Sequence, residues 1–240
     1  MSLLITLCAR GGSVGIPKKN IKNLIGKPLI KYSYDHAIEF KSIYSGKCHI
    51  SLSTDSDEIK KIYNSFGNKV NYKRNKRLAS NNASKTETIK DLLEYEENRL
   101  NIKFDYILDL DISSPLRNLN DLNQAFQKFQ LNKDALNIFS VSKANKNPYF
   151  NMVEKGEHGY YNLVKSSENF NSRQKSPNVF DMNASFYFYR RSFFERKNLT
   201  VITDKSMIYE IPHICFDLDH EIDFSFIEYL MINKLLDFKI

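Results

Sequence analysis

The sequence has little cysteine. Its 240 residues include three, Cys8, Cys48 and Cys215. The number is odd and the spacing is not that of metal ligands, which excludes a disulfide-stapled fold and a zinc cluster. A chain of this length buries about 70% of its unfolded surface, so its core needs no such crosslink. We therefore expect a reduced, cytoplasmic protein.

Long apolar segments are missing as well. No run approaches the roughly 20 residues with which a helix crosses a bilayer. The first ten residues, MSLLITLCAR, lack the positive start and the long apolar core of a signal peptide. The five histidines show neither a catalytic triad nor metal-ligand spacing. We expect no membrane partner, and we assign no histidine to catalysis.

Positive charge is in excess, with a formal net charge of +7, but the lysines are scattered rather than gathered in one block. A basic balance suits either nucleic acid or small anionic substrates. Because no signature of a nucleic-acid-binding fold is present, we expect no nucleic acid partner. A basic nucleic-acid-binding module without catalysis is the alternative from another functional class.

The first 140 residues alternate apolar strands with amphipathic helices. The pattern predicts strands at 3–8, 49–55, 69–73, 104–112 and 136–142, and helices at 28–40, 55–66, 84–99 and 119–129. The face of the first helix that we expect to be buried consists of Leu29, Tyr32, Ser33, His36, Ala37 and Phe40. Capping boxes are predicted at Asp55–Glu58 and Ser84–Glu87. This alternation indicates an α/β, Rossmann-like three-layer fold, with a mainly parallel sheet and helices on both faces. Ligands then lie at the carboxyl ends of the strands.

The alternation of strands and helices stops between residues 145 and 183, where turn-forming residues are frequent and no helical periodicity is seen. We interpret this part as an inserted hairpin and loop within a single domain that spans residues 1–240. Strand patterns return at 184–190, 207–212 and 213–219. A last helix is predicted from Glu221 to Leu236, with Ile227, Leu230, Met231 and Leu235 as its buried stripe.

A glycine-rich turn, CARGGSVGIPKKN at residues 8–20, follows the first strand. Such a turn lets backbone N–H groups approach an anion closely. Its spacing is neither that of the dinucleotide-binding fingerprint nor that of the Walker motif. Arg10 supplies a planar fork for phosphate oxygens, Lys19 a movable point charge, and Asn20 both donors and acceptors. The cluster suits a nucleoside triphosphate; the alternative is a solvated basic loop.

The motifs ARGGSVGIPKKN, IGKPLI, STD and SSPLR occur in this order. Together they resemble the acylneuraminate cytidylyltransferase family, the CMP-sialic acid synthetases, along nearly the whole chain. The resemblance implies a nucleotide-diphospho-sugar transferase fold, dimerisation through the inserted segment, and activation of a nine-carbon 2-keto acid sugar by CTP with release of pyrophosphate. It assigns Arg10, Lys19 and Asn20 to the triphosphate. It also implies that the backbone of Ala9, Gly11, Gly12 and Ser13 cradles the base and phosphates.

The segment RNKRLASNNAS, residues 74–84, resembles another motif of that family. The resemblance places Arg74 against the nucleotide and Ser84 near its base or ribose. The alternative for Ser84 is that it only caps a helix. Two positions depart from the family pattern: Val14 stands where many members have lysine, and Asn81 where aspartate is usual.

The segment LDLDISSPLR, residues 108–117, looks like the subgroup that activates legionaminic acid. Asp111 and Ser113 are therefore predicted to bind the sugar. Arg173 is the candidate for the sugar carboxylate, because its fork matches a carboxylate bidentately. Gln174 and Asn183 are predicted to read hydroxyl or acetamido groups. A buried ion pair of Arg173 with Asp181 is the structural alternative.

Two acids stand two residues apart near the C-terminus, Asp217 and Asp219 in FDLDHEIDF. On an extended segment they face the same way, and two converging carboxylates call for a cation. We predict that they bind magnesium, Mg²⁺, which prefers a few carboxylates together with substrate phosphates. The predicted catalytic residues are Arg10, Lys19 and Asp219. The rival hypotheses are the same reaction on N-acetylneuraminic acid, pseudaminic acid or a shorter 2-keto acid, and a nucleotide sensor without activity.

Overall fold

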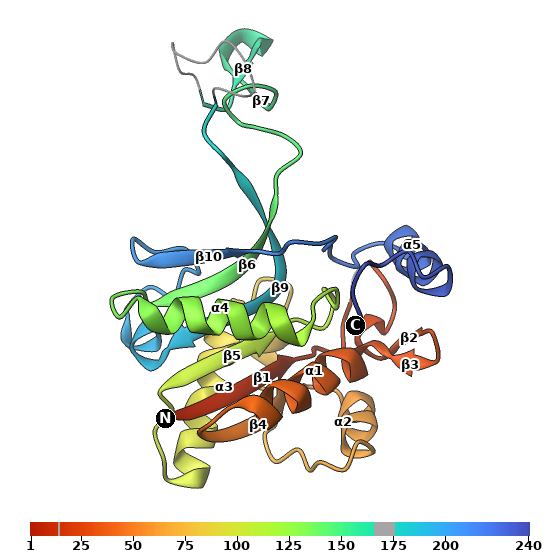
Figure 1. Cartoon of the computed structure of the whole chain (residues 1–240), viewed down its shortest axis with the longest axis vertical. Coiled ribbons are helices and arrows are strands. Elements are labelled where there is room, and N and C mark those ends of the chain that lie inside the picture. The colour runs from red at the N-terminus through yellow and green to blue at the C-terminus, as the bar shows by residue number, and fades with distance from the viewer. Residues whose placement is uncertain (14, 166–175) are drawn as a thin grey trace.

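A six-stranded sheet forms the centre of the computed structural model, which describes residues 1–13, 15–165 and 176–240 (Figure 1). The strand order is β10-β6-β9-β5-β1-β4. The strands are β1 (Ser2–Cys8), β4 (Lys47–Ser53), β5 (Tyr106–Leu110), β6 (Asn137–Lys143), β9 (Phe180–Arg190) and β10 (Ser206–Glu210). Only β9 runs antiparallel to its neighbours in this sheet. The predicted α/β class with a mainly parallel sheet is confirmed.

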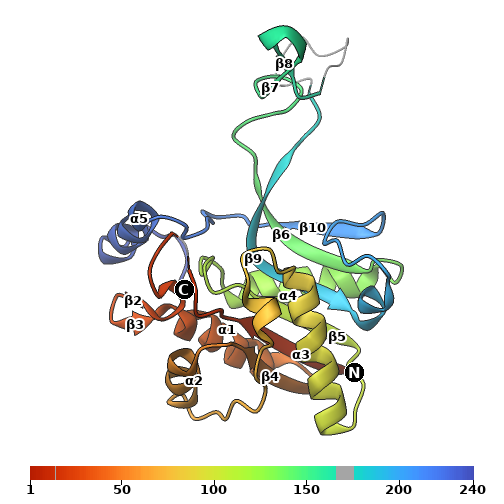
Figure 2. The same cartoon turned by 180° about the vertical axis from the view of Figure 1, so that it is seen from behind.

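Helices cover both faces of the sheet, as Figures 1 and 2 show from opposite sides. The α-helices of the described residues are α1 (Leu29–Ile43), α2 (Asp57–Asn64), α3 (Lys85–Leu100), α4 (Leu119–Leu131) and α5 (Glu221–Ile232). Helices α1 and α4 cover one face and α3 the other. Alternation along β1 explains this: Leu3 and Ile5 belong to the core under α1 and α4, whereas Leu4 belongs to the core under α3. The six residues predicted on one face of α1 are all buried.

Three local predictions are wrong, each because a distant contact decides the structure. Residues 69–73 form no strand; Val70 and Tyr72 are buried by their side chains, and the Tyr72 hydroxyl donates to Asp91 on α3. Residues 213–219 form no strand; the Leu218 N–H donates instead to the Ser113 carbonyl oxygen at 2.8 Å. The cap of α2 is Ser56, whereas the Asp55 carboxylate accepts a hydrogen bond from a backbone N–H of the glycine-rich turn.

The C-terminal helix is shorter than predicted. It ends at Ile232, and Leu235 is 56% exposed, so Leu235 is not part of the buried stripe. Ile227 and Leu230 are buried as expected. A small antiparallel pair, β2 (Asn23–Leu24) and β3 (Lys27–Pro28), lies at the same end of the molecule as α5 (Figure 1). Within residues 1–13, 15–165 and 176–240, the helices are all too short or too polar to cross a bilayer.

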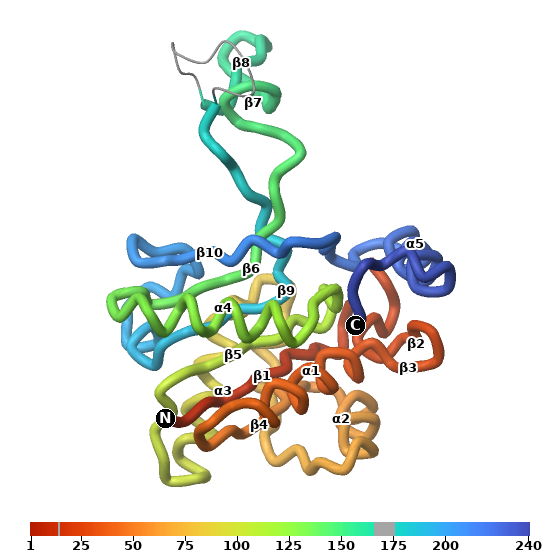
Figure 3. Tube along the Cα trace, viewed as in Figure 1, coloured from red at the N-terminus to blue at the C-terminus, as the bar shows by residue number. Residues whose placement is uncertain are grey.

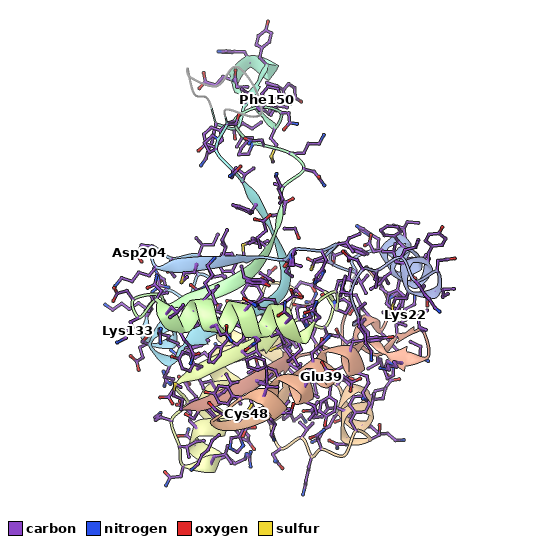
Figure 4. All side chains as sticks on the ribbon, viewed as in Figure 1. Lys22, Glu39, Cys48, Lys133, Phe150 and Asp204 are labelled. Atoms are coloured by element: carbon purple, nitrogen blue, oxygen red, sulfur yellow. The ribbon has the colours of Figure 1, made fainter. Side chains whose placement is uncertain are left out.

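An arm projects from the body where β6 ends and β9 begins (Figures 1 and 3). Its described part contains the antiparallel pair β7 (Val153–Lys155) and β8 (Tyr161–Leu163). Both strands are exposed along their length, and Phe150 lies near them at the far end of the arm (Figure 4). Its described residues fall within the predicted insertion, residues 145–183; its role in dimerisation stays a prediction.

Candidate active site

A cavity of about 400 Å³ opens at the carboxyl ends of β1 and β5. The strand order reverses at β1, which pairs with β4 on one side and β5 on the other, and ligands of open α/β sheets bind at such a switch point. The predicted site residues that line the cavity are Arg10, Ser13, Lys19, Asn20, Arg74, Asp111, Ser113 and Asp219. Segments far apart in the sequence therefore meet at one polar cavity.

The glycine-rich turn is held in shape by its own polar side chains and by its neighbours. Asn20 Nδ2 donates to the Arg10 carbonyl oxygen at 2.9 Å, and the Gly11 N–H donates to Asp55 Oδ1 at 2.8 Å. Arg10 Nη1 donates to Asn81 Oδ1 at 2.7 Å across the cavity. Asn81, which stands where the family usually has aspartate, therefore orients Arg10 through its side-chain oxygen. Position 14 lies outside the described residues.

The glycine-rich turn and the C-terminal acids are in direct contact. Lys19 Nζ donates to the Leu218 carbonyl oxygen at 2.7 Å and pairs with Asp219 Oδ1 at 3.1 Å. Gly15 approaches the same backbone so closely that a Cβ there would lie 2.1 Å from the Asp219 carbonyl oxygen. Residues 200 positions apart therefore form one wall of the cavity.

Asp217, the other predicted metal ligand, lies two residues before Asp219 and is not among the residues that line the cavity. Its Oδ1 is buried and has no hydrogen-bond partner. Burial, and then the nearby charges of Asp111 and Asp219, raise the pKa of Asp217 to about 6. An orphaned carboxylate oxygen beside two further carboxylates fits a divalent cation. Among the described residues, however, no group of three or more His, Cys, Asp or Glu side chains is preassembled as a metal site, so a cation needs further oxygens from a substrate.

A partly buried ion cluster that the sequence analysis missed, with Asp109 fully buried, also borders the cavity. Lys85 Nζ lies 2.8 Å from Asp109 Oδ2 and 2.5 Å from Asp111 Oδ2. Burial alone would lower the pKa of Lys85, but the two carboxylates raise it well above its usual value. Burial would likewise raise the pKa of Asp111, yet Lys85 and Ser113 outweigh it and lower that pKa to about 2. The site therefore holds a fixed ammonium between two fixed carboxylates.

The predicted nucleotide residues differ in how they face the cavity. Arg74 is buried and lines it, with Nε donating to Ser53 Oγ and Nη2 to the Ser53 carbonyl oxygen, each at 2.8 Å. Ser84 caps α3 by accepting from the Glu87 N–H at 3.4 Å and does not line the cavity. Ala9, Gly11 and Gly12 belong to the turn but are not among the residues that line the cavity.

The predicted sugar residues are only partly brought together. Asp111 and Ser113 line the cavity, but Asn183 is buried in a bulge between β6 and β9, where Oδ1 accepts from Ser140 Oγ at 2.7 Å and Nδ2 donates to Ser142 Oγ at 2.9 Å. Its side chain is thus committed to the sheet. Arg173 and Gln174 lie outside the described residues. Asp181, the partner in the alternative interpretation, is exposed.

Arg117 of the SSPLR motif is structural. It is completely buried, and its guanidinium donates to the carbonyl oxygens of Asp111 at 2.8 Å and Ser114 at 2.9 Å. It also donates to the Ser185 carbonyl oxygen on β9. Burial lowers the pKa of Arg117 to about 10, so the group stays charged at neutral pH. The motif therefore fixes the turn that carries Asp111 and Ser113 into the cavity.

Comparison with known proteins agrees with this geometry. The sequence model of a family described as Cytidylyltransferase matches residues 4–236. The chain is 37% identical over 238 residues to post-translational flagellin modification protein B of Campylobacter coli, covering 99% of this chain and 98% of that protein. It is 36% identical over 235 residues to CMP-N,N'-diacetyllegionaminic acid synthase of Campylobacter jejuni, covering 98% and 97%. The solved structure of CMP:2-keto-3-deoxy-manno-octonic acid synthetase with CTP has the same fold, with a TM-score of 0.70 at 15% identity over 98% of this chain and 100% of that chain.

Proposed function

The chain belongs to the cytidylyltransferase family, and we propose that it transfers CMP from CTP to a nine-carbon 2-keto acid sugar of the legionaminic type, releasing pyrophosphate. The observation that carries this proposal is the contact of Lys19 with Leu218 and Asp219, which unites the glycine-rich turn and the acids around one cavity. The enzyme class, a nucleotidyltransferase, follows from the family.

The triphosphate occupies the cationic end of the cavity. Lys19 and Arg10 supply positive charge there, and the turn from Ala9 to Ser13 brings its backbone close to the phosphates. Arg74, held by Ser53, sits beside the strand end where the nucleoside is expected. These groups are fixed before the substrate arrives, so they stabilise developing charge without reorganising.

Asp217 and Asp219 would hold Mg²⁺, together with phosphate oxygens of CTP. The orphaned Oδ1 of Asp217 supports this assignment. Bound there, the ion would neutralise phosphate charge and make the sugar's hydroxyl more acidic. Lys19, already paired with Asp219, would keep that carboxylate oriented and remain close to the leaving phosphates.

The reaction is an in-line displacement. The anomeric hydroxyl oxygen at C2 of the sugar forms a bond with the α-phosphorus, and the bond from that phosphorus to the bridging oxygen of the β-phosphate breaks. Pyrophosphate leaves with the electron pair, and the hydroxyl proton is lost to solvent. The protein contributes position and charge: Arg10 and Lys19 stabilise the leaving group, and Asp111 with Ser113 orients the sugar.

We also propose a homodimer joined through the arm. The described arm exposes a set of large apolar side chains, which in soluble proteins marks an interaction surface: Phe150, Met152, Val153, Tyr160 and Tyr161. Sedimentation should give twice the mass of one chain. A Val153→Asp/Tyr161→Asp variant should sediment as a monomer; a dimer in that variant would contradict the arm's role.

The test of the function is pyrophosphate release from CTP with a panel of acid sugars: N,N'-diacetyllegionaminic, pseudaminic and N-acetylneuraminic acids. We expect the legionaminic sugar to give the highest kcat/KM; a higher value for either rival would reassign the substrate. Asp219→Ala should abolish turnover with the fold intact. Glu221→Ala is the matched control, because Glu221 pairs with Lys22 at the surface and should keep normal activity. Normal turnover by Asp219→Ala would refute the proposal.

A further inference from the structure

Lys85 and Asp109 each stand at a position that disfavours their charge, and they lie next to each other. Lys85 is the first residue of α3, where the helix dipole disfavours a cation. Asp109 lies inside the central strand β5 and is completely buried, where an isolated carboxylate is strongly unfavourable. Each is compensated by the other, with Lys85 Nζ 2.8 Å from Asp109 Oδ2, and Thr6 Oγ1 donates to Asp109 Oδ1 at 2.7 Å. Such paired exceptions are typical of functional sites.

Neutralising Asp109 does not explain why Lys85 also reaches the cavity. Its side chain is 32% exposed, lines the cavity and pairs with Asp111 Oδ2. The ring of Tyr187 lies 5.0 Å from Nζ and restricts it from another direction. The ammonium is thereby fixed at the cavity wall beside the Asp111 carboxylate.

Lys85 and Asp111 together keep hydrogen-bonding groups that a ligand could use. Lys85 Nζ donates to Asp111 Oδ2 and forms an ion pair with Asp109, so of the three N–H donors of its ammonium at least one remains for a ligand. Asp111 Oδ1 accepts from both the N–H and the hydroxyl of Ser113, at 2.8 and 2.7 Å. Asp111 Oδ2, bonded to Lys85, retains one lone pair. One donor and one acceptor therefore remain side by side.

We propose that Lys85 is a specificity-determining residue, which with Asp111 forms a donor–acceptor edge for an acylamino substituent of the acid sugar. The amide N–H donates to Asp111 Oδ2, and the amide carbonyl oxygen accepts from Lys85 Nζ. The proposal rests on the function proposed above. A hydroxyl group offers both members of the edge a single oxygen atom, whereas an amide offers a separate donor and acceptor, so the edge favours the amide.

The charge of the cluster argues against a phosphate at this position. Lys85 with Asp109 and Asp111 carries a net formal charge of −1 (one ammonium, two carboxylates). A phosphate placed here would be repelled by that negative charge, whereas Arg10 and Lys19 offer it positive charge elsewhere in the cavity. The edge is therefore part of the sugar's site and not of the nucleotide's.

The experiment must separate a contact with the sugar from support of the fold. Lys85→Met alone leaves Asp109 buried and uncompensated, so that variant can simply fail to fold. Lys85→Met/Asp109→Asn removes both charges, and the Asn oxygen still accepts from Thr6. Lys90→Met is the matched control on the same helix, because Lys90 makes only a loose surface pair, 3.9 Å from Glu94.

Steady-state kinetics of pyrophosphate release would be measured with CTP and two sugars, N,N'-diacetyllegionaminic acid and an analogue with hydroxyls in place of its acetamido groups. The double variant should fold by circular dichroism. We expect its kcat/KM for the diacetyl sugar to fall roughly 10–100-fold, the gap that one or two unpaired polar groups produce. Its KM for CTP should stay within about twofold of the wild-type value, and its preference over the hydroxyl analogue should shrink.

Three outcomes would overturn the inference. Wild-type kinetics in the double variant would mean that Lys85 only neutralises Asp109. A raised KM for CTP with an unchanged KM for the sugar would move Lys85 to the nucleotide. If the unmodified enzyme released no pyrophosphate with either sugar, the proposed function itself would fail, and the assignment of Lys85 with it.

Discussion

Gly15→Ala is the sharpest test of how the cavity is assembled. Gly15 faces the backbone of Asp219, and an added Cβ would lie 2.1 Å from that carbonyl oxygen and 3.3 Å from its carbon. Ordinary contact begins at about 3.5 Å, so the two segments must separate by roughly 1.4 Å. Because the atoms in the way belong to the backbone, no side-chain rotation relieves the clash.

The size of the effect follows from that displacement. A shift of about 1 Å in a catalytic group costs roughly 100-fold in rate, or about 2.7 kcal/mol of transition-state stabilisation. Asp219 moves away from Lys19, so kcat and the apparent Mg²⁺ affinity should both fall. The cost in unfolding free energy should be only about 1–3 kcal/mol, since the clash lies at the edge of the cavity.

The assay is pyrophosphate release at varied Mg²⁺ and CTP, with Gly12→Ala as the comparison. The same methyl group at Gly12 meets nothing within 4 Å. Gly12 belongs to the turn proposed to hold the phosphates, so that variant should raise the KM for CTP without changing the Mg²⁺ dependence. If Gly15→Ala kept kcat and Mg²⁺ dependence within about threefold of wild type, the contact between the two segments would not matter to catalysis.

Three further predictions concern single side chains. Lys19→Ala should slow the single-turnover rate about 100-fold and leave the KM for the sugar nearly unchanged, whereas Lys18→Ala, which breaks only a surface pair 2.8 Å long, should behave as wild type. Arg117→Met leaves buried carbonyl oxygens without donors and should lower the free energy of unfolding in urea by on the order of 3 kcal/mol; an unchanged midpoint would exclude the structural role. Burial would lower the pKa of His213, but its bonds to Asp121 and to a carbonyl oxygen raise it above 6.5, so the imidazolium stabilises the fold below pH 6.5 and that contribution is lost as pH rises through the folded-state pKa. His213→Gln should therefore lower Tm most at acid pH, and a difference that widened toward pH 9 would contradict this.

Most of the sheet was predictable because its strands are short apolar runs with turns between them. The helix faces of α1 and α5 followed from their periodicity, apart from Leu235 beyond the helix end. Motifs that directly follow strand ends supplied cavity-lining residues, as at Arg10 after β1 and Asp111 after β5. Gathering those residues at one cavity follows from the parallel topology.

What could not be predicted depends on contacts between distant residues. Asp55 and Ser56 are equally good caps in sequence, and the structure uses Ser56 because the Asp55 carboxylate binds Gly11. Asn183 looked like a sugar ligand, but the bulge against β6 uses both ends of its amide. Little in the sequence distinguishes Lys85 from the other lysines. Only its position at a helix start, with an aspartate inside the apolar run YILDL, hinted at the ion cluster.

The position of β9 has a consequence for how the chain acquires its structure. This strand lies between β5 and β6, although it is made after both of them and after the whole arm. Until residue 190 has left the ribosome, the edge of β5 that pairs with β9 therefore has no partner strand. The parallel strands β4, β1 and β5 then form only part of the sheet. Pairings at such long range form slowly and leave hydrophobic edges open to other chains. Nascent copies of this protein should accordingly be most vulnerable to aggregation while the arm is being translated.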